Sequence, residues 1–111
     1  MNYSEMLIKV GNIDSVTAGA LKNIARLITR HHRLCEMEAN GEGYIRGRYY
    51  NIEAKDAYIS EDMDVFQYEL EKIENKIRAF VGMLKGYSVK FSHDPRGATV
   101  KIMKGDELVI Y

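Results

Sequence analysis

The sequence has little cysteine, proline or tryptophan: one cysteine, one proline and no tryptophan occur in 111 residues. A single cysteine excludes an intrachain disulfide and a zinc site made of several thiolates. Neither charge dominates, because 16 Lys and Arg residues balance 16 Asp and Glu residues, which argues against a basic protein that coats nucleic acid. No apolar run approaches the roughly 18 residues of a membrane span, and no basic segment precedes an apolar one at the start. We therefore expect a cytoplasmic protein with no membrane contact and no signal peptide.

What the chain does contain is typical of one globular domain. Hydrophobic residues make up 46% and charged residues 29% of it, values that exclude wholesale disorder. A chain of this length can bury a core without disulfides or metals. We predict a single domain over residues 1–111, in which the short apolar cluster before Gly11 forms either a strand or a helical turn.

Residues 15–40 show the pattern of an amphipathic helix. Asp14 and Ser15 can accept hydrogen bonds from the first free amides, and Asn40-Gly41 is a typical left-handed stop. One face carries side chains that recur every three or four residues: Val16, Ala20, Ile24, Leu27, Ile28, His31, Leu34 and Cys35. A different face carries three arginines, which either bind phosphate through their planar guanidinium groups or simply face solvent: Arg26, Arg30 and Arg33.

Residues 51–85 are predicted to form a second, longer helix that ends at Gly86. Its apolar residues alternate in steps of four and three, as in a coiled-coil seam: Ile59, Met63, Phe66, Leu70, Ile73, Ile77, Phe80 and Leu84. Ser60 is a second possible start, since it can cap a helix whose first turn is acidic. Two antiparallel helices of this length cannot cover each other's apolar faces, so we expect a second copy to complete the seam in a homodimer.

The C-terminal segment, residues 87–111, changes to the period of two that is typical of strands. Tyr87, Val89 and Phe91 alternate with polar residues, and Asp94-Pro95-Arg96-Gly97 has the composition of a turn. A second glycine-containing turn leads to a last strand. The predicted fold class is therefore α+β, an antiparallel helical hairpin followed by a three-stranded antiparallel β-meander.

The sequence gives little support to catalysis or metal binding. The acidic side chains of the second helix, among them Glu69, Glu71 and Glu74, alternate with lysines as on a solvated, salt-bridged helix face. His31 and Cys35 are four residues apart and so a possible metal pair, but two ligands are too few for a closed zinc site. His31 also lies on the apolar face, and no serine or cysteine nucleophile has a partnered base. We predict no enzymatic activity, no cofactor and no metal.

Two short segments are the candidate binding sites. Residues 41–50, with three glycines, are predicted to form a flexible loop whose tyrosines and arginines suit base stacking and phosphate binding, and equally a protein-binding hot spot. In the turn after residue 92, Arg96 is not needed to form the turn, and it projects where it can hold an anion. The loop and the turn are expected at opposite ends of the helix pair, so that they meet only across a dimer. The candidate binding residues are Arg46, Arg48, Tyr49, Tyr50, His93, Asp94 and Arg96.

Two elements of the sequence resemble a loose group of small bacteriophage and prophage proteins. One is the end of the first helix, Glu36-Met37-Glu38-Ala39-Asn40-Gly41, and the other runs from Tyr87 through Asp94-Pro95-Arg96-Gly97 to Ile102. Proteins of this group have a helix with a Cys-Asn-Gly-like end, a long second helix and an Asp-Pro-Arg-Gly hairpin; Ala39 stands where the group has cysteine. Since their function is unknown, the resemblance implies a phage origin and no particular chemistry.

Two hypotheses on function follow from these observations. In the first, the chain is a non-enzymatic phage accessory protein in the cytoplasm of the host cell that binds a bacterial protein, such as a component of host defence. In the second, it binds a nucleotide or single-stranded nucleic acid through the Arg/Tyr loop and the Asp-Pro-Arg-Gly turn. Salt distinguishes the two, because phosphate binding weakens steeply as the salt concentration rises.

Overall fold

The computed structural model describes residues 14–53 and 61–110. These residues form two helices, α2 (Ser15–Asn40) and α3 (Glu61–Gly82). They also form a two-stranded antiparallel sheet of β1 (Glu42–Ile45) and β2 (Arg48–Asn51). A three-stranded antiparallel sheet follows, in the order β3 (Tyr87–Phe91), β4 (Val100–Lys104) and β5 (Glu107–Ile110). The predicted α+β class is confirmed, whereas the apolar cluster before Gly11 lies outside the described residues.

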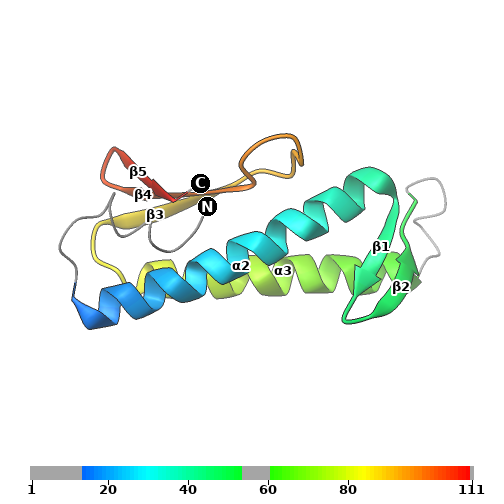
Figure 1. The fold of residues 1–111 in the computed structure, drawn as a ribbon, viewed down its shortest axis with the longest axis horizontal. Helices are drawn as coiled ribbons and strands as arrows, with labels where there is room; N and C mark the ends of the chain where they lie inside the picture. Colours follow the sequence, from blue (N-terminus) through cyan, green and yellow to red (C-terminus); the bar gives the residue numbers. More distant parts are fainter. Residues whose placement is uncertain (1–13, 54–60, 111) are drawn as a thin grey trace.

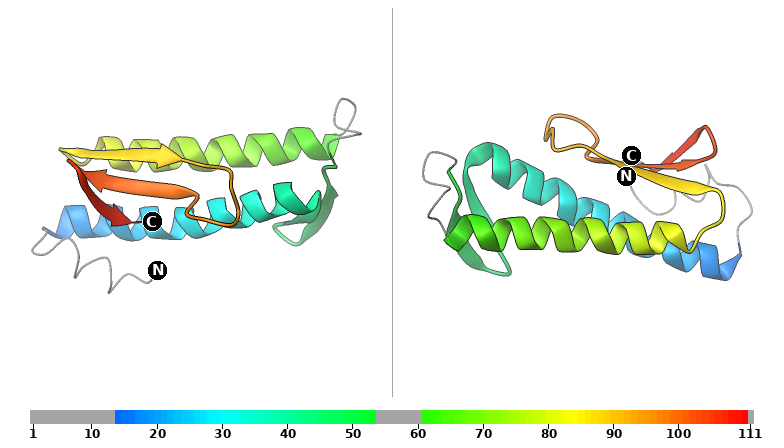
Figure 2. Two further views of the ribbon diagram at one scale, coloured as in Figure 1. Left: turned by 90° about the horizontal axis from the view of Figure 1, so that it is seen from above. Right: turned by 180° about the vertical axis from the view of Figure 1, so that it is seen from behind.

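The two helices lie side by side and run in opposite directions, and the three-stranded sheet covers one face of the pair (Figures 1 and 2). Seen from above, β3 lies over α3, and β5 lies on the side of α2 (Figure 2, left). The β1–β2 hairpin packs at the far end, where α2 ends and α3 begins (Figure 1). The molecule is therefore elongated, with extents of 48 × 24 × 23 Å.

Both ends of α2 are fixed by local signals. The Asp14 side chain accepts a hydrogen bond from the Thr17 amide at 2.7 Å, which satisfies one of the free amides of the first turn. At the other end Gly41 has φ 77°, and its N–H donates to the carbonyl of Met37 at 2.9 Å, a left-handed stop. The predicted helix over residues 15–40 is confirmed.

The predicted second helix over residues 51–85 begins too early and ends slightly too late. Asn51 is the last residue of β2, and α3 runs only from Glu61 to Gly82. The backbone N–H of Asn51 donates to the Asp62 carboxylate at 3.0 Å, so the end of the hairpin is tied directly to the first turn of α3. The predicted seam residue Ile59 and the possible start at Ser60 lie outside the described residues.

The predicted flexible loop over residues 41–50 is wrong, because this segment is a β-hairpin. Tyr44 pairs with Tyr49 across the strands, and the turn between them has φ 50° at Arg46 and φ 83° at Gly47. Two consecutive positive φ angles are what a two-residue hairpin turn needs. A Cβ on Gly43 would lie 2.7 Å from Cγ of Met37, so this glycine allows the hairpin to pack closely on α2. The glycines therefore serve particular contacts and turns rather than flexibility.

The seam of α3 is buried within the single chain. Phe66, Ile73 and Ile77 are 3% exposed or less, and they share one core with Val100 and Ile102 of the sheet. The uncovered seam that led us to expect a homodimer is thus not found among the described residues, and the homodimer stays a prediction. In the same part of the chain, neither helix combines the length and the apolar composition that a membrane crossing requires.

Candidate functional site

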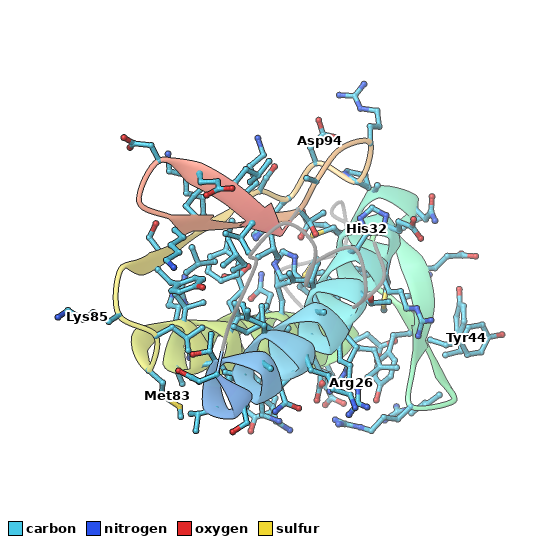
Figure 3. The ribbon with its side chains drawn as sticks, turned by 60° about the vertical axis from the view of Figure 1, so that its left-hand side comes forward. Arg26, His32, Tyr44, Met83, Lys85 and Asp94 are labelled. Atoms are coloured by element: carbon cyan, nitrogen blue, oxygen red, sulfur yellow. The ribbon has the colours of Figure 1, made fainter. Side chains whose placement is uncertain are left out.

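A cleft of about 160 Å³ lies between α2, α3 and the tip of the β1–β2 hairpin. We call it the arginine cleft. Figure 3 shows Arg26, one helical turn before it on α2, on the side of that helix that faces away from the three-stranded sheet. The arginine stripe of α2 and the Arg/Tyr segment, which are separate in the sequence, meet here. The polar residues that line the cleft are Arg30, Arg33, Tyr44, Arg46 and Glu69.

The charges of the arginine cleft do not balance. Arg46 forms an ion pair with Glu69, whose side chain is 3% exposed, while that of Arg46 is 63% exposed. Within residues 14–53 and 61–110, Arg30 and Arg33 have no carboxylate partner. Three guanidinium groups therefore line the cleft with one carboxylate, and the surplus positive charge suits an anionic ligand.

The backbone at the hairpin tip is in the left-handed region at Arg46. A residue with a side chain in the left-handed region costs roughly 1–2 kcal/mol, and Asn or Gly normally occupies this position of the turn. Arg46 is the one described residue other than glycine with a positive φ. Its side chain pairs with Glu69 at the cleft, and backbone strain of this kind is often found at functional positions.

The other predicted binding residues of the hairpin divide between its two faces. Tyr50 is buried at 7% exposure, and the guanidinium carbon of Arg48 lies 4.8 Å from its ring centroid. On the outer face Tyr44 and Tyr49 form an edge-to-face pair with centroids 5.6 Å apart, and they are 72% and 46% exposed. The hydroxyl of Tyr49 donates to Glu42 at 3.1 Å, and this hydrogen bond raises the pKa of Tyr49. Tyr50 thus belongs to the core, and the exposed aromatic surface is the Tyr44–Tyr49 pair.

The turn after β3 is closed by its own side chains. The Asp94 carboxylate accepts hydrogen bonds from the backbone N–H of Arg96 at 3.0 Å and from its Nε at 3.2 Å. These bonds lower the pKa of Asp94. Arg96 has an exposed side chain, but its guanidinium group is already paired within the turn.

The expectation that this turn and the hairpin lie at opposite ends of the helix pair is wrong. Because β3 runs back along α3, the turn returns to the half of the molecule that holds the hairpin (Figure 1). Gly97 and Ala98 line a hollow with Thr29, His32 and Arg33 of α2. The turn and the hairpin therefore line different hollows, and Arg33 of α2 lines both of them.

A second cluster lies on the sheet side of the helices. Oε2 of Glu74, on α3, is 2.8 Å from Nε2 of His31 on α2 and 2.9 Å from Nε2 of His93 after β3. The side chain of His31 is fully buried, that of Glu74 is 13% exposed, and that of His93 is 46% exposed. One carboxylate oxygen thus joins two imidazoles from different elements.

Burial and hydrogen bonding act in opposition in this second cluster. Burial lowers the pKa of His31, against the hydrogen bond to Glu74, which raises it. Burial acts to raise the pKa of Glu74, but the hydrogen bonds from His31 and His93 outweigh it and hold that pKa below its usual value. Burial raises the pKa of the Cys35 thiol to about 11, so Cys35 stays protonated at neutral pH and is a poor nucleophile.

Glu69 and Glu74 are the residues that the sequence analysis misjudged. Both were expected on a solvated helix face, whereas both are largely covered and paired. Each stands next to a seam residue, Glu69 before Leu70 and Glu74 after Ile73. Charged residues at such flanking positions of a heptad often form ion pairs with a neighbouring element. Their position beside the seam is therefore the sequence feature from which these two pairs could have been predicted.

The comparisons with known proteins give no assignment. The chain matches no family model, no curated protein and no solved structure. The resemblance to phage proteins therefore stays a prediction, and function has to be argued from the two sites themselves.

Proposed function

We propose that this protein is a non-enzymatic binding protein that holds phosphate-bearing ligands, such as nucleotides or single-stranded nucleic acid, in the arginine cleft. The observation that carries the proposal is the convergence of Arg30, Arg33 and Arg46 on one cleft that contains a single carboxylate. Guanidinium groups bind phosphate through paired N–H donors, and neither helix arginine has to give up a described carboxylate to do so.

The geometry around the cleft also suits a base. Arg30 and Arg33 are three residues apart on α2, so their Cβ atoms lie about 5–6 Å from each other on one helix face. Tyr44 is among the residues at the cleft, and its ring is exposed beside the cleft on the outer face of the hairpin, paired with that of Tyr49. Neighbouring cations and exposed aromatic rings are the combination that binds single strands, in which phosphates meet the cations and bases stack on the rings.

A second candidate function is the binding of a bacterial protein, which the exposed tyrosines favour. Tyrosine and arginine are enriched in the energetic hot spots of protein interfaces, and Tyr44 and Tyr49 present such a surface on the outer face of the hairpin. With the phage origin that the resemblance implies, the partner would be a protein of the host, such as a defence component.

The test is a binding titration with labelled oligothymidylate, followed by fluorescence anisotropy, and with nucleoside triphosphates, followed by calorimetry. Arg30→Ala/Arg33→Ala is expected to weaken binding of both kinds of ligand more than tenfold, with residual oligonucleotide binding measurable at low salt. The matched control is Lys90→Ala/Lys101→Ala. It removes two exposed lysines that lie opposite each other on β3 and β4, and it should bind both ligands as the wild type does.

Two results would contradict the proposal. The first is the absence of oligonucleotide and nucleotide binding at low salt. The second is equal loss of binding in the two double variants, which would mean that net charge rather than the cleft matters. Capture of a bacterial protein that depends on Tyr44 and Tyr49 but not on Arg30 and Arg33 would favour the second candidate function instead.

A further inference from the structure

We infer that His31, Glu74 and His93 form a binding site for one divalent transition-metal ion, with Zn²⁺ as the ion of choice. The three residues come from α2, α3 and the segment after β3, and their ligand atoms all lie within 4.8 Å of one another. Convergence of donors from three separate elements distinguishes this cluster from a chance pair on one helix. The site lies on the opposite side of the helix pair from the arginine cleft and does not depend on the proposed function.

The donor set fits a borderline metal ion. Two imidazole nitrogens and one carboxylate oxygen are the ligands of zinc sites that keep a fourth position open for water. Imidazole favours zinc, nickel and copper, whereas magnesium and calcium prefer oxygen donors alone. The cluster therefore selects for a transition metal on chemical grounds.

The spacing of the donors is close to what the ion needs. With bonds of about 2.0–2.2 Å, tetrahedral ligands lie about 3.3–3.5 Å apart. Oε2 of Glu74 is now 2.8 and 2.9 Å from the two Nε2 atoms, so the ion must separate these atoms by about 0.5 Å. His93 is half exposed and lies outside any helix or strand, so a small shift of this residue can make the room.

The surroundings fix one side of the site and leave the other open. His31 is fully buried, and its ring packs at 5.5 Å from the ring of Phe91. Its second nitrogen, Nδ1, lies 3.7 Å from Sγ of Cys35. This contact orients the ring that would present Nε2 to the metal. The His93 side is accessible to solvent, so the ion can enter there and retain a water ligand.

The structure also excludes Cys35 as a ligand of the same ion. Cys35 faces Nδ1 of His31, whereas Glu74 and His93 meet at Nε2. The His31–Cys35 metal pair considered from the sequence is therefore not the arrangement that we propose. A thiolate signal from the bound metal is not expected.

The positive charge of Arg78 lowers the affinity of the site for a metal ion. Its Nη2 atom lies 3.7 Å from the second oxygen of Glu74, and its guanidinium group lies over the Phe91 ring at 4.7 Å. A fixed positive charge at this distance repels a dication. Arg78→Gln should therefore tighten metal binding several-fold, which is the reverse of what removal of a supporting residue would do.

The experiment uses the tag-free full chain, with ZnCl₂ in equilibrium dialysis and CoCl₂ in absorption spectroscopy. We expect one Zn²⁺ per chain, a rise in the melting temperature with Zn²⁺, and Co²⁺ bands of tetrahedral type without a thiolate charge-transfer band. His93→Ala and Glu74→Gln should each weaken binding more than tenfold. His32→Ala is the matched control, since it removes the neighbouring histidine of a separate pair with Glu36, and it should bind as the wild type does.

Several outcomes would overturn the inference. These are no Zn²⁺ binding above the level of the His93→Ala variant, equal loss of binding in His32→Ala, or a thiolate band with Co²⁺. Melting curves in EDTA show whether each variant is folded. Because the His93 side chain is half exposed, His93→Ala should melt near the wild-type temperature without metal, so that its loss of binding reports on the ligand itself.

Discussion

Glu69 and Glu74 are five residues apart on α3, which turns them about 140° from each other around the helix axis. Glu69 meets Arg46, a permanent cation from the hairpin, on the side of the arginine cleft. Glu74 meets two imidazoles on the side of the sheet. Arginine keeps its charge at every relevant pH, whereas imidazole loses its proton and can bind a metal instead. One helix thus carries two carboxylates whose partners suit opposite ligands: anions at the arginine cleft and metal cations at the histidines.

A charge placed on the buried face of α3, the helix that carries both glutamates, should have the largest effect on stability. Ile77 is fully buried in the core, and an unpaired carboxylate at that position costs several kcal/mol. Ile77→Asp should therefore unfold the protein or lower its unfolding free energy by about 3 kcal/mol or more in urea denaturation. An unchanged denaturation midpoint would show that the seam of α3 is not the core of this fold.

Removing the permanent cation should have the next largest effect. Arg46→Ala leaves the covered Glu69 carboxylate without its partner. Because Arg46 is largely exposed, water can replace part of the interaction, so we expect a loss of about 1–2 kcal/mol in unfolding free energy. The control is Arg48→Ala, whose side chain lies over the Tyr50 ring and which should cost under about 1 kcal/mol. Equal losses for the two variants would mean that Glu69 does not need Arg46.

The turns beside the two sites differ in backbone conformation and should respond differently to substitution. Gly47, at the hairpin tip, has φ 83°, whereas Gly97, after β3, is not among the glycines with positive φ. Nothing lies within 4 Å of a Cβ added at either position. Gly47→Ala should therefore cost about 1 kcal/mol through backbone strain, and Gly97→Ala less than about 0.5 kcal/mol. Thermal unfolding of both variants measures the difference, and a reversed order would contradict the assigned turn geometry.

The smallest effect expected is a pH dependence of stability near neutral pH that comes from the histidine cluster. Burial lowers the pKa of His31 below its usual value of 6.5. As the pH drops through that range, the unfolded chain binds a proton more readily than the folded chain, so the unfolding free energy decreases. The lowered pKa of Glu74 adds a loss below pH 4.5. Between about pH 7.5 and 5.5 the drop in unfolding free energy should shrink in His31→Gln. A drop of equal size in the variant would assign the pH dependence to other groups.

Local signals explain what the sequence predicted well. The bounds of α2 follow from Asp14 and Gly41, which act on neighbouring amides and carbonyls. The three C-terminal strands follow from their alternation and from turn residues between them. The β1–β2 hairpin was missed because its strands have four residues each and its turn uses Arg-Gly where Asn-Gly is the strong signal.

Tertiary packing explains what the sequence could not predict. Arg46 was a candidate from its loop and Arg30 and Arg33 from their helix face, but only the folded hairpin brings them to one cleft. Likewise His31 and His93 are 62 positions apart (93 − 31 = 62), and only the sheet that packs on the helices unites them at Glu74. Neither the hairpin nor the sheet contact leaves a periodic pattern in the sequence.

The salt dependence of oligonucleotide binding tests the central claim most directly. For single strands the slope of log K against log salt concentration changes by about 0.7 for each phosphate contact. If Arg30 and Arg33 each hold a phosphate, Arg30→Ala/Arg33→Ala should reduce the slope by about 1.4, while Lys90→Ala/Lys101→Ala keeps the wild-type slope. An unchanged slope in the first variant, or the same reduction in both, would contradict phosphate binding in the arginine cleft.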